Sequence, residues 1–239
     1  MQLDRAQSVL EIAAGAGLGS LDVVQYLVDG RSKLPRDAKR TFTVTDLSPV
    51  MVGLAEKTLS GAGSANVEIK CQEANDLIEV ATGSMDRYIA SLCIQLAPDL
   101  DAILREANRV LTSDGIAGFT IWGSPDRSGN FTIASAANKE MGFEESAGEH
   151  SNFVMGKDLP ALRQRFAAAG FTRVKIWPFQ CVVELWSGEE FAKFLQDTHP
   201  LEDEALRAKR FAIVQRMADE WLAKGTPIGL ETYIILARK

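Results

Sequence analysis

The stretch S-V-L-E-I-A-A-G-A-G-L-G-S, residues 8–20, decides the fold of this chain. Its first part, Ser8–Ala13, is a short apolar run of the kind that forms a buried parallel strand. Gly15 and Gly17 then allow a tight turn, because a residue without a Cβ adopts backbone angles that other residues avoid. Apolar residues at helical spacing follow over Leu18–Val28. Together they predict a strand, a glycine turn and a helix whose free N-terminus favours an anionic group on a ligand.

The same alternation continues along the chain. Further strands are predicted at Thr41–Thr45, Val67–Cys71, Asp86–Cys93, Gly115–Trp122, Thr172–Trp177 and Glu231–Ala237, and helices after Ser48-Pro49 and over Asp99–Leu111 and Leu159–Ala169. Strands separated by helices imply right-handed crossovers and a parallel sheet. We therefore predict one α/β domain over residues 1–239, with a doubly wound, mostly parallel, seven-stranded sheet and helices on both faces.

Two segments depart from this alternation. Residues 123–157 are rich in Gly, Ser, Asn and Glu, and a connection of this length in a compact domain is usually functional. We predict a mobile lid here, with aromatic residues that form part of an acceptor pocket; a static cap or a dimer contact are the alternatives. These aromatic residues are Trp122, Phe131, Phe143 and Phe153. Residues 178–228 are predicted to be a helical insert before the last strand, with His199 in a turn between two helices.

Composition and charge restrict the class of protein. The chain has 239 residues and a formal net charge of -6, so its surface repels phosphate backbones and we expect no nucleic-acid partner. The 3 cysteines, Cys71, Cys93 and Cys181, are far apart and form no C-x-x-C pair, so neither a disulfide framework nor a metal site is expected. We find no signal peptide and no apolar run long enough for membrane insertion, which predicts a cytoplasmic protein.

The ligand of such a sheet binds at the carboxyl ends of the strands. Asp46 directly follows the second predicted strand, where a carboxylate can accept hydrogen bonds from both ribose hydroxyls of a nucleoside. Helix capping beside Ser48-Pro49 is the alternative role for this acid. A dinucleotide fingerprint needs Gly or Ala at position 20, which is Ser20 here. The glycine turn and the acid together predict a nucleoside site.

At these motifs the chain resembles the class I S-adenosylmethionine (SAM)-dependent methyltransferases. E-x-A-x-G-x-G over Glu11–Gly17 resembles their motif I, and V-T-D-L-S-P-V-M around Asp46 resembles the acid after their second strand. Similar segments follow at Cys71–Leu77, Asp86–Gly115 and Leu162–Phe171. The resemblance is to the small-molecule branch that includes the ubiquinone and menaquinone methyltransferases. It implies a Rossmann-like sheet with an antiparallel last strand, SAM as cofactor and S-adenosyl-L-homocysteine as product.

The resemblance also implies cofactor-binding residues. The glycine loop would lie under the methionine part of SAM, Asp46 would hold the ribose, and the residues after the third and fourth strands would lie beside the adenine and the reacting methyl group. These residues are Glu11, Ala13, Gly15, Gly17, Asp46, Leu47, Met51, Glu73, Ala74, Ser91, Leu92 and Gln95. Ala13 replaces the first motif I glycine, which predicts a wider loop or weaker binding. Valine at Gly15 or Gly17 is expected to block the cofactor with little loss of folding, and Asp46→Ala to weaken binding with the fold intact.

The acceptor is predicted from what strand four lacks. Neither the (D/N)-P-P-(Y/F) signature nor a Pro-Cys nucleophile follows it, so we expect a small-molecule acceptor and, at Cys93, a buried small hydrophobe. His150 is the candidate general base, since an unperturbed pKa of about 6.5 suits that role; an exposed lid histidine is the alternative. An NAD(P)-dependent oxidoreductase and a non-catalytic methyltransferase-like binding subunit remain open. So does a homo-oligomer, in which another subunit closes the pocket.

Overall fold

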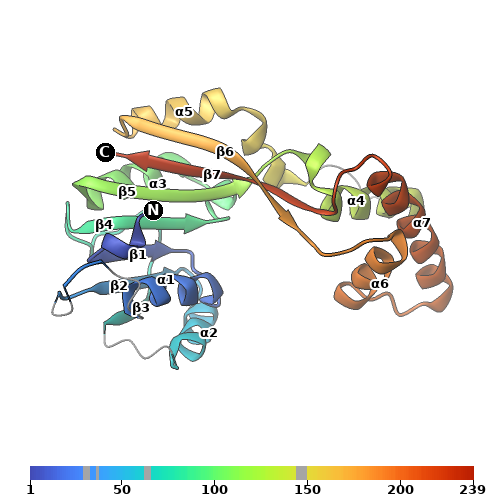
Figure 1. Ribbon diagram of the computed structural model, residues 1–239, viewed down its shortest axis with the longest axis horizontal. Coiled ribbons are helices and arrows are strands. Elements are labelled where there is room, and N and C mark those ends of the chain that lie inside the picture. Colours follow the sequence, from blue (N-terminus) through green and yellow to red (C-terminus); the bar gives the residue numbers. More distant parts are fainter. Residues whose placement is uncertain (29–32, 36–37, 62–65, 144–149) are drawn as a thin grey trace. The chain divides into compact units, whose positions relative to one another are not determined.

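A computed structural model describes residues 1–28, 33–35, 38–61, 66–143 and 150–239 of the chain (Figure 1). These residues form two compact units. Unit 1 consists of Met1–Ile121, Leu159–Trp177 and Ile234–Lys239, and unit 2 consists of Trp122–Asp158 and Pro178–Tyr233. The last two strands of the chain cross from one unit to the other, and each unit has its own core.

The described residues contain a 7-stranded sheet in the order β3-β2-β1-β4-β5-β7-β6. Its strands are β1 (Ser8–Ile12), β2 (Thr41–Asp46), β3 (Val67–Cys71), β4 (Met85–Ser91), β5 (Leu111–Trp122), β6 (Arg173–Val182) and β7 (Gly229–Arg238). β1 pairs in parallel with β2 and with β4, β2 with β3, and β4 with β5. β7 alone runs in the opposite direction (Figure 1). The predicted doubly wound, mostly parallel sheet with an antiparallel last strand is therefore confirmed.

Helices flank the sheet of unit 1 and begin at the residues that the sequence indicates. They are α1 (Leu18–Val28), α2 (Pro49–Leu59), α3 (Leu100–Val110) and α5 (Leu159–Ala168). The Ser48 side chain accepts a hydrogen bond from the backbone N–H of Met51 and so caps α2, with Pro49 in its first turn. Asp99 caps α3 in the same way. α1 packs against α2, and α3 against α5.

The core of unit 1 lies on both faces of the sheet because neighbouring strand residues point to opposite sides. Val9 packs with Val24 of α1 and Phe42 of β2 in one cluster. On β4 and β5, the rings of Tyr88 and Phe119 lie 5.7 Å apart, and Phe119 contacts Phe166 of α5 at 5.1 Å. Full burial of such side chains contributes about 1.5–3 kcal/mol each, which fixes the strands whose ends carry the site.

β5 and β6 extend furthest beyond their predicted bounds. β5 begins at Leu111 rather than at Gly115 and so includes the polar segment T-S-D, and the register of its pairing with β4 shifts between Met85 and Arg87. A bulge of this kind accommodates polar turn residues within a strand. β6 continues through Pro178 to Val182. Proline is tolerated there because β6 is an edge strand of the sheet.

Unit 2 is mainly helical, with α4 (Gly129–Met141), α6 (Gly188–Thr198) and α7 (Glu204–Leu222). Helix α7 packs against both α4 and α6, around a core that includes Ile133, Phe191 and Val214. The helical insert is thus present, and His199 follows the end of α6 as predicted. Helix α4 lies inside the segment that we predicted to be a lid, of which residues 144–149 are outside the described part of the chain.

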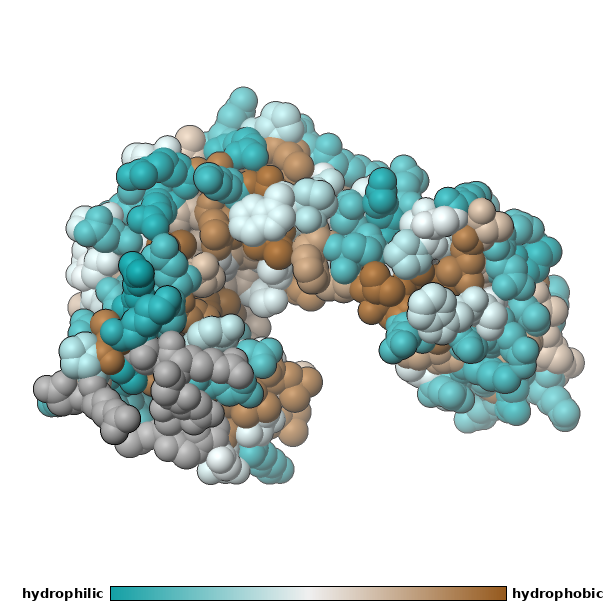
Figure 2. Space-filling model, viewed as in Figure 1, coloured by the Kyte–Doolittle hydropathy of each residue, from teal (hydrophilic) through white to brown (hydrophobic). Residues whose placement is uncertain are grey.

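Short 3-10 turns complete the description: η1 (Leu3–Arg5), η2 (Ile94–Leu96), η3 (Pro125–Arg127), η5 (Ser151–Phe153) and η6 (Met155–Lys157). The face shown in Figure 2 is largely hydrophilic, and apolar patches interrupt it. In unit 1, Leu47 and Val50 near the start of α2 are among the exposed apolar side chains. In the described ranges, no helix has the length and hydropathy to span a membrane.

Candidate functional site

The glycine loop leaves β1 at the carboxyl edge of the sheet. The backbone N–H of Ala14 donates to Thr45 O of β2 at 3.0 Å, and Gly17 N–H donates to Ala14 O at 3.1 Å, which closes the turn. Gly15 and Gly17 have φ angles of +58° and +78°. Ala13 also has a positive φ, 50°, although it carries a Cβ. The loop therefore keeps left-handed backbone angles at all three positions, where glycine is the favoured residue.

The two glycines face different surroundings, which corrects one expectation. A Cβ on Gly15 would meet no atom within 4 Å. A Cβ on Gly17 would lie 3.2 Å from both Cα and Cβ of Ala55, in helix α2. Gly17 thus permits the close approach of α2 to the loop, and Gly17→Val is now expected to lower the stability of the fold.

Asp46 ends β2 and joins the loop to the following helix. Its Oδ2 accepts a hydrogen bond from the backbone N–H of Gly15 at 2.8 Å, and its Oδ1 accepts from Ser48 N–H at 2.9 Å. Its backbone carbonyl accepts from Gln72 N–H at 3.0 Å, at the end of β3. The carboxylate is therefore fixed between the first two strand ends, and each of its oxygens keeps a further lone pair for a ligand hydroxyl.

Glu11 lies beneath the loop. Its side chain is 4% exposed, and its Oε2 accepts a hydrogen bond from Ser20 Oγ of α1 at 2.6 Å. Burial raises the pKa of this carboxyl group, and the hydrogen bond from Ser20 opposes that effect in part. Thr45 Oγ1 donates to the Glu11 carbonyl at 3.1 Å. Glu11 thus ties β1 to α1 and β2.

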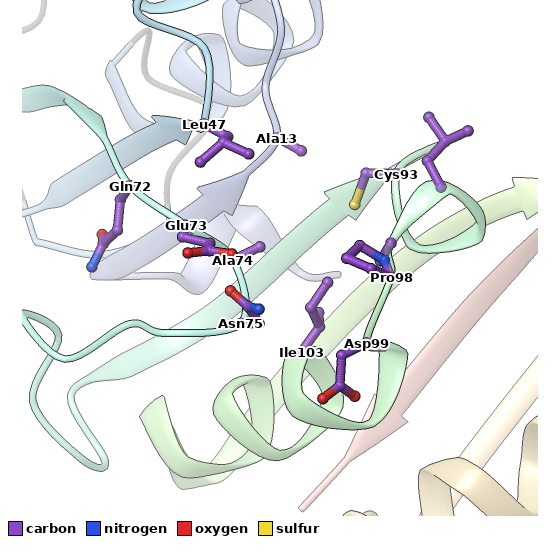
Figure 3. A pocket seen from close by; sticks show the side chains of 12 residues that line it. Ala13, Leu47, Gln72, Glu73, Ala74, Asn75, Cys93, Pro98, Asp99 and Ile103 are labelled. Carbon is purple, nitrogen blue, oxygen red and sulfur yellow. The ribbon is translucent and has the colours of Figure 1, made fainter.

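A cavity of about 260 Å³ opens at this edge of the sheet (Figure 3). It is lined by Ala13, Leu47, Gln72, Glu73, Ala74, Asn75, Cys93, Leu96, Ala97, Pro98, Asp99 and Ile103. The lining comes from the segments that follow β1, β2, β3 and β4 and from the start of α3. Of the predicted cofactor residues, Ala13, Leu47, Glu73 and Ala74 line it. The others lie at or near the same strand ends but outside its lining: Glu11, Gly15, Gly17, Asp46, Met51, Ser91, Leu92 and Gln95.

Sequence reasoning did not predict the cavity residues that come from the segment before α3 and from α3, nor Gln72 and Asn75 after β3. Leu96 of η2 and Ala97 are in the lining, and Pro98, Asp99 and Ile103 of α3 lie opposite Leu47 (Figure 3). The polar run Q-E-A-N after β3 was the available signal for Gln72 and Asn75. Asn75 Oδ1 and both amide atoms of Gln72 are buried without a hydrogen-bond partner in the described residues. Unpaired buried polar atoms that line a cavity are suited to a polar ligand.

The segment after β4 is held in a strained conformation. Leu92 has a φ of 52°, and its N–H donates to Thr120 O and to Thr120 Oγ1, each at 3.0 Å. Ser91 Oγ lies 2.9 Å from the same Thr120 hydroxyl. Gln95 donates from Nε2 to Leu92 O at 2.9 Å, and its Oε1 is buried with no partner among the described residues. These hydrogen bonds fix the strand end next to the cavity.

Cys93 lines the cavity, but its chemistry does not suit a nucleophile. Burial raises the pKa of its thiol to about 12, and the nearby Asp46 carboxylate adds to the rise. The thiolate is the reactive form of cysteine, and it is scarce at neutral pH with such a pKa. The geometry thus agrees with a packing role.

Three of the predicted acceptor-pocket aromatics meet in unit 2. The Trp122 ring lies 4.1 Å from Phe131 and 4.9 Å from Phe153, and 4.8 Å from the imidazole of His150. Phe143 has no ring contact in the described residues. His150 Nδ1 accepts a hydrogen bond from the backbone N–H of Asn152 at 3.2 Å, which caps η5. That bond occupies the lone pair with which a neutral imidazole accepts a proton.

Comparisons with known proteins agree with this geometry. Residues 10–119 match the family profile described as a methyltransferase domain. The fold matches a Bacillus halodurans protein described as a candidate methyltransferase, with 15% identity, a TM-score of 0.59, and coverage of 99% of this chain and 93% of that one. It also matches the cyclase SpnF, with 21% identity, a TM-score of 0.56, and coverage of 99% and 76%.

A further match is phosphoethanolamine N-methyltransferase 2 of Haemonchus contortus, solved with S-adenosylhomocysteine. It has 16% identity and a TM-score of 0.55, and the alignment covers 98% of this chain and 49% of that one. A search of the curated proteins found no match. Residues 10–119 therefore match a class I SAM-dependent methyltransferase domain. SAM is the cofactor of this family.

Proposed function

We propose that this chain transfers the methyl group of SAM to a small-molecule acceptor by in-line displacement at the sulfonium methyl. The cavity lined by the segments after β1 to β4 carries the proposal, because ligands of doubly wound sheets bind at the carboxyl ends of the strands. SAM supplies an activated methyl group with a good leaving group. The protein therefore needs to bind, orient and exclude water rather than to generate a strong nucleophile.

Asp46 is the proposed ribose ligand. Hydrogen bonds from Gly15 and Ser48 already hold its carboxylate in place, so the free lone pairs are oriented before a ligand arrives. A prearranged acceptor loses little side-chain entropy on binding. Gly15, where an added Cβ would meet only open space, lets a ligand approach the backbone of the loop.

The cavity in Figure 3 is the proposed adenine pocket. Leu47, Ala74 and Ile103 give it apolar walls that suit a flat aromatic base. The adenine amine is a donor, and the Glu73 carboxylate and the unpaired Asn75 Oδ1 are acceptors in the lining. Sequence motifs proposed only Glu73 for this contact, and the structure adds Asn75 as a candidate. Met51 is outside the lining, so its contact with adenine stays a prediction.

The acceptor site is proposed around Trp122, Phe131 and Phe153. A lid role for residues 123–157 belongs to this proposal. Since Ile133 and Ala137 of α4 are buried in the core of unit 2, closure would have to move the helix together with its core partners. Hydrogen exchange of α4 with and without S-adenosylhomocysteine tests this. Equal exchange in both states would leave the segment as scaffold.

The role of His150 as a general base stays a prediction. The hydrogen bond that its Nδ1 accepts from Asn152 argues against it.

Calorimetric titration of Asp46→Ala with S-adenosylhomocysteine tests the proposal. Loss of two hydrogen bonds to a charged acceptor should weaken binding by on the order of 2–4 kcal/mol. The variant also leaves the N–H groups of Gly15 and Ser48 unpaired, which should lower the free energy of unfolding by about 1–3 kcal/mol. The sequence-based expectation of an intact fold is revised accordingly, and binding must be measured where the variant is folded.

Asp22→Ala is the matched control. Asp22 is exposed on α1 and has no hydrogen bond or ion pair within the described ranges. It should bind S-adenosylhomocysteine as the wild type does. Equal affinity of the Asp46 variant and the wild type would refute the proposed ribose site. NAD is the control ligand, and tighter binding of NAD than of S-adenosylhomocysteine would favour an oxidoreductase.

A further inference from the structure

A second cavity, of about 280 Å³, lies within unit 2. Residues of helices α4, α6 and α7 line it, together with His199, which follows α6. It is lined by Asn130, Phe131, Ala134, Asn138, Phe194, Leu195, Thr198, His199 and Arg210. It shares no residue with the cavity of Figure 3.

Arg210 is the unusual member of this lining. It is 6% exposed, and no carboxylate of the described residues lies within ion-pair distance of it. Its Nη2 donates to Gln196 Oε1 and, at 2.7 Å, to the carbonyl of His199. Guanidinium carries five N–H donors, so Nε and Nη1 retain three that have no acceptor in the described part of the chain. Neither nitrogen is among the fully buried unpaired side-chain atoms of the described residues, so both are within reach of a ligand, and an anion would supply the missing opposite charge.

A structural role explains only half of this side chain. Because His199 caps the end of α6, the Nη2 contacts are those of a cation that stabilises a helix C-terminus. That role needs neither Nε nor Nη1. It also does not explain Asn130 and Asn138, whose side-chain amides make no hydrogen bond to another described residue and stand in the same lining.

The remaining lining fits an anion with an apolar body. None of its residues is Asp or Glu, although the whole chain has 32 acidic against 26 basic residues. Phe131, Phe194 and Leu195 supply apolar surface. The Phe131 ring lies 4.1 Å from the ring of Trp122, which is outside the lining, so this contact fixes the position of Phe131. Such a mixture of a few polar donors and apolar walls is characteristic of small-molecule sites.

We infer that this cavity binds a small molecule that carries a carboxylate or phosphate group on an apolar body. The anion accepts a single hydrogen bond from Nε or from Nη1 of Arg210, because both edges with which guanidinium binds two oxygens at once include Nη2, which Gln196 and His199 occupy. The side-chain amides of Asn130 and Asn138 are further donors within the lining. The apolar body packs against Phe131 and Phe194. The site does not depend on SAM, and it stands if the proposed methyl transfer fails.

Titration of the intact chain with matched probes tests the inference. The probes are 4-phenylbutyrate, its uncharged amide 4-phenylbutyramide, and phenyl phosphate, and the readout is protein NMR shifts or calorimetry in a buffer without competing anions. We expect at least one anion to bind at least roughly tenfold more tightly than the amide, and the two anions to distinguish a carboxylate from a phosphate ligand. Equal binding of all probes, or no binding at millimolar concentrations, would overturn the inference.

Variants locate the site. Arg210→Gln should remove the preference for the anion, but it also loses a cap of α6, so a second variant is needed. Asn138→Asp places a like charge in the lining near the end of α4 and should weaken anion binding roughly tenfold or more while S-adenosylhomocysteine binding is unchanged. Lys209→Gln is the control, because Lys209 is exposed on α7 and lies outside the lining. An equal effect of the Lys209 and Asn138 variants would show nonspecific charge attraction and overturn the site.

Discussion

Alanine at Gly17 tests the structure of the glycine loop, because both the backbone and the surroundings of this residue disfavour a side chain. Its φ is +78°, and an added Cβ would lie 3.2 Å from Cα and Cβ of Ala55. Gly15 provides the matched control. It also has a positive φ, +58°, but an added Cβ there meets nothing within 4 Å. The two alanine variants therefore differ in the contact with α2.

The expected loss of unfolding free energy has two sources: the positive φ at both glycines and, at Gly17 alone, the contact with α2. An alanine in the left-handed region costs about 1–2 kcal/mol, and the lower entropy of alanine in the unfolded chain returns about 0.4–1 kcal/mol. Gly15→Ala should therefore lower the free energy of unfolding by about 0.5–1 kcal/mol. At Gly17 the extra methyl group also overpacks the loop against α2, which typically costs about 1–3 kcal/mol. Gly17→Ala should thus lose about 2–3 kcal/mol, and Gly17→Val more, because β-branched residues rarely adopt a positive φ.

Urea denaturation of both variants measures these losses. A double-mutant cycle with Ala55→Gly isolates the contact: the helix propensity cost of glycine in α2 cancels, and the coupling free energy between positions 17 and 55 should be about 1 kcal/mol or more. Equal destabilisation by Gly15→Ala and Gly17→Ala would refute the reasoning. So would a coupling free energy indistinguishable from zero.

Further predictions concern Glu11, the cysteines and Ala13. Burial raises the folded-state pKa of Glu11 above its ordinary 4.5, so its contribution to stability is present below that pH and is lost as the pH rises through the folded value. Glu11→Gln should therefore reduce the decline in unfolding free energy above pH 4.5, and parallel pH profiles for variant and wild type would contradict this. Iodoacetamide at mildly alkaline pH should label the exposed Cys71 and Cys181 but not Cys93, whose thiol pKa is raised to about 12. Mass spectrometry measures the labelling, and equal labelling of all three cysteines would contradict the prediction for Cys93. Ala13→Gly should raise the free energy of unfolding by up to about 1 kcal/mol, since the relief of left-handed strain exceeds the added chain entropy, and a clear loss in urea denaturation would oppose that assignment.

The sheet and its helices could be predicted because their signals are local. The bounds of α1 (Leu18–Val28) and β3 (Val67–Cys71) are those expected from the sequence. Helix α4 was missed because its signal is tertiary. Gly129 opens it and is a poor helix former, but a Cβ there would lie 2.8 Å from the Trp221 ring of α7, so the glycine permits close packing. Helical stability in proteins comes largely from such packing.

The sequence motifs predicted only part of the cavity lining. Motifs locate residues that follow each strand, so Ala13, Leu47 and Ala74 were found. They do not tell which later segment lies across the cavity, and Ile103 of α3 gives no signal of its own beyond helical spacing. Motifs also do not reveal which way a glycine faces, so they gave no sign that the Cβ position of Gly17 is next to Ala55 of α2.

Backbone strain at the site is the part that no sequence pattern reveals. Among the described residues, three non-glycine residues have a positive φ: Gln2, Ala13 and Leu92. Gln2 lies near the start of the sequence, whereas Ala13 and Leu92 follow the adjacent strands β1 and β4. Each such conformation costs of order 1–3 kcal/mol and persists only where neighbouring contacts enforce it. The contacts here are the hydrogen bonds from Ala14 to Thr45 O and from Leu92 to Thr120 O. Alanine in place of the first motif glycine is thus accommodated as strain, and its methyl group lines the cavity wall. Since strain concentrates at functional sites, this pair at the centre of the sheet supports the placement of the ligand at this edge.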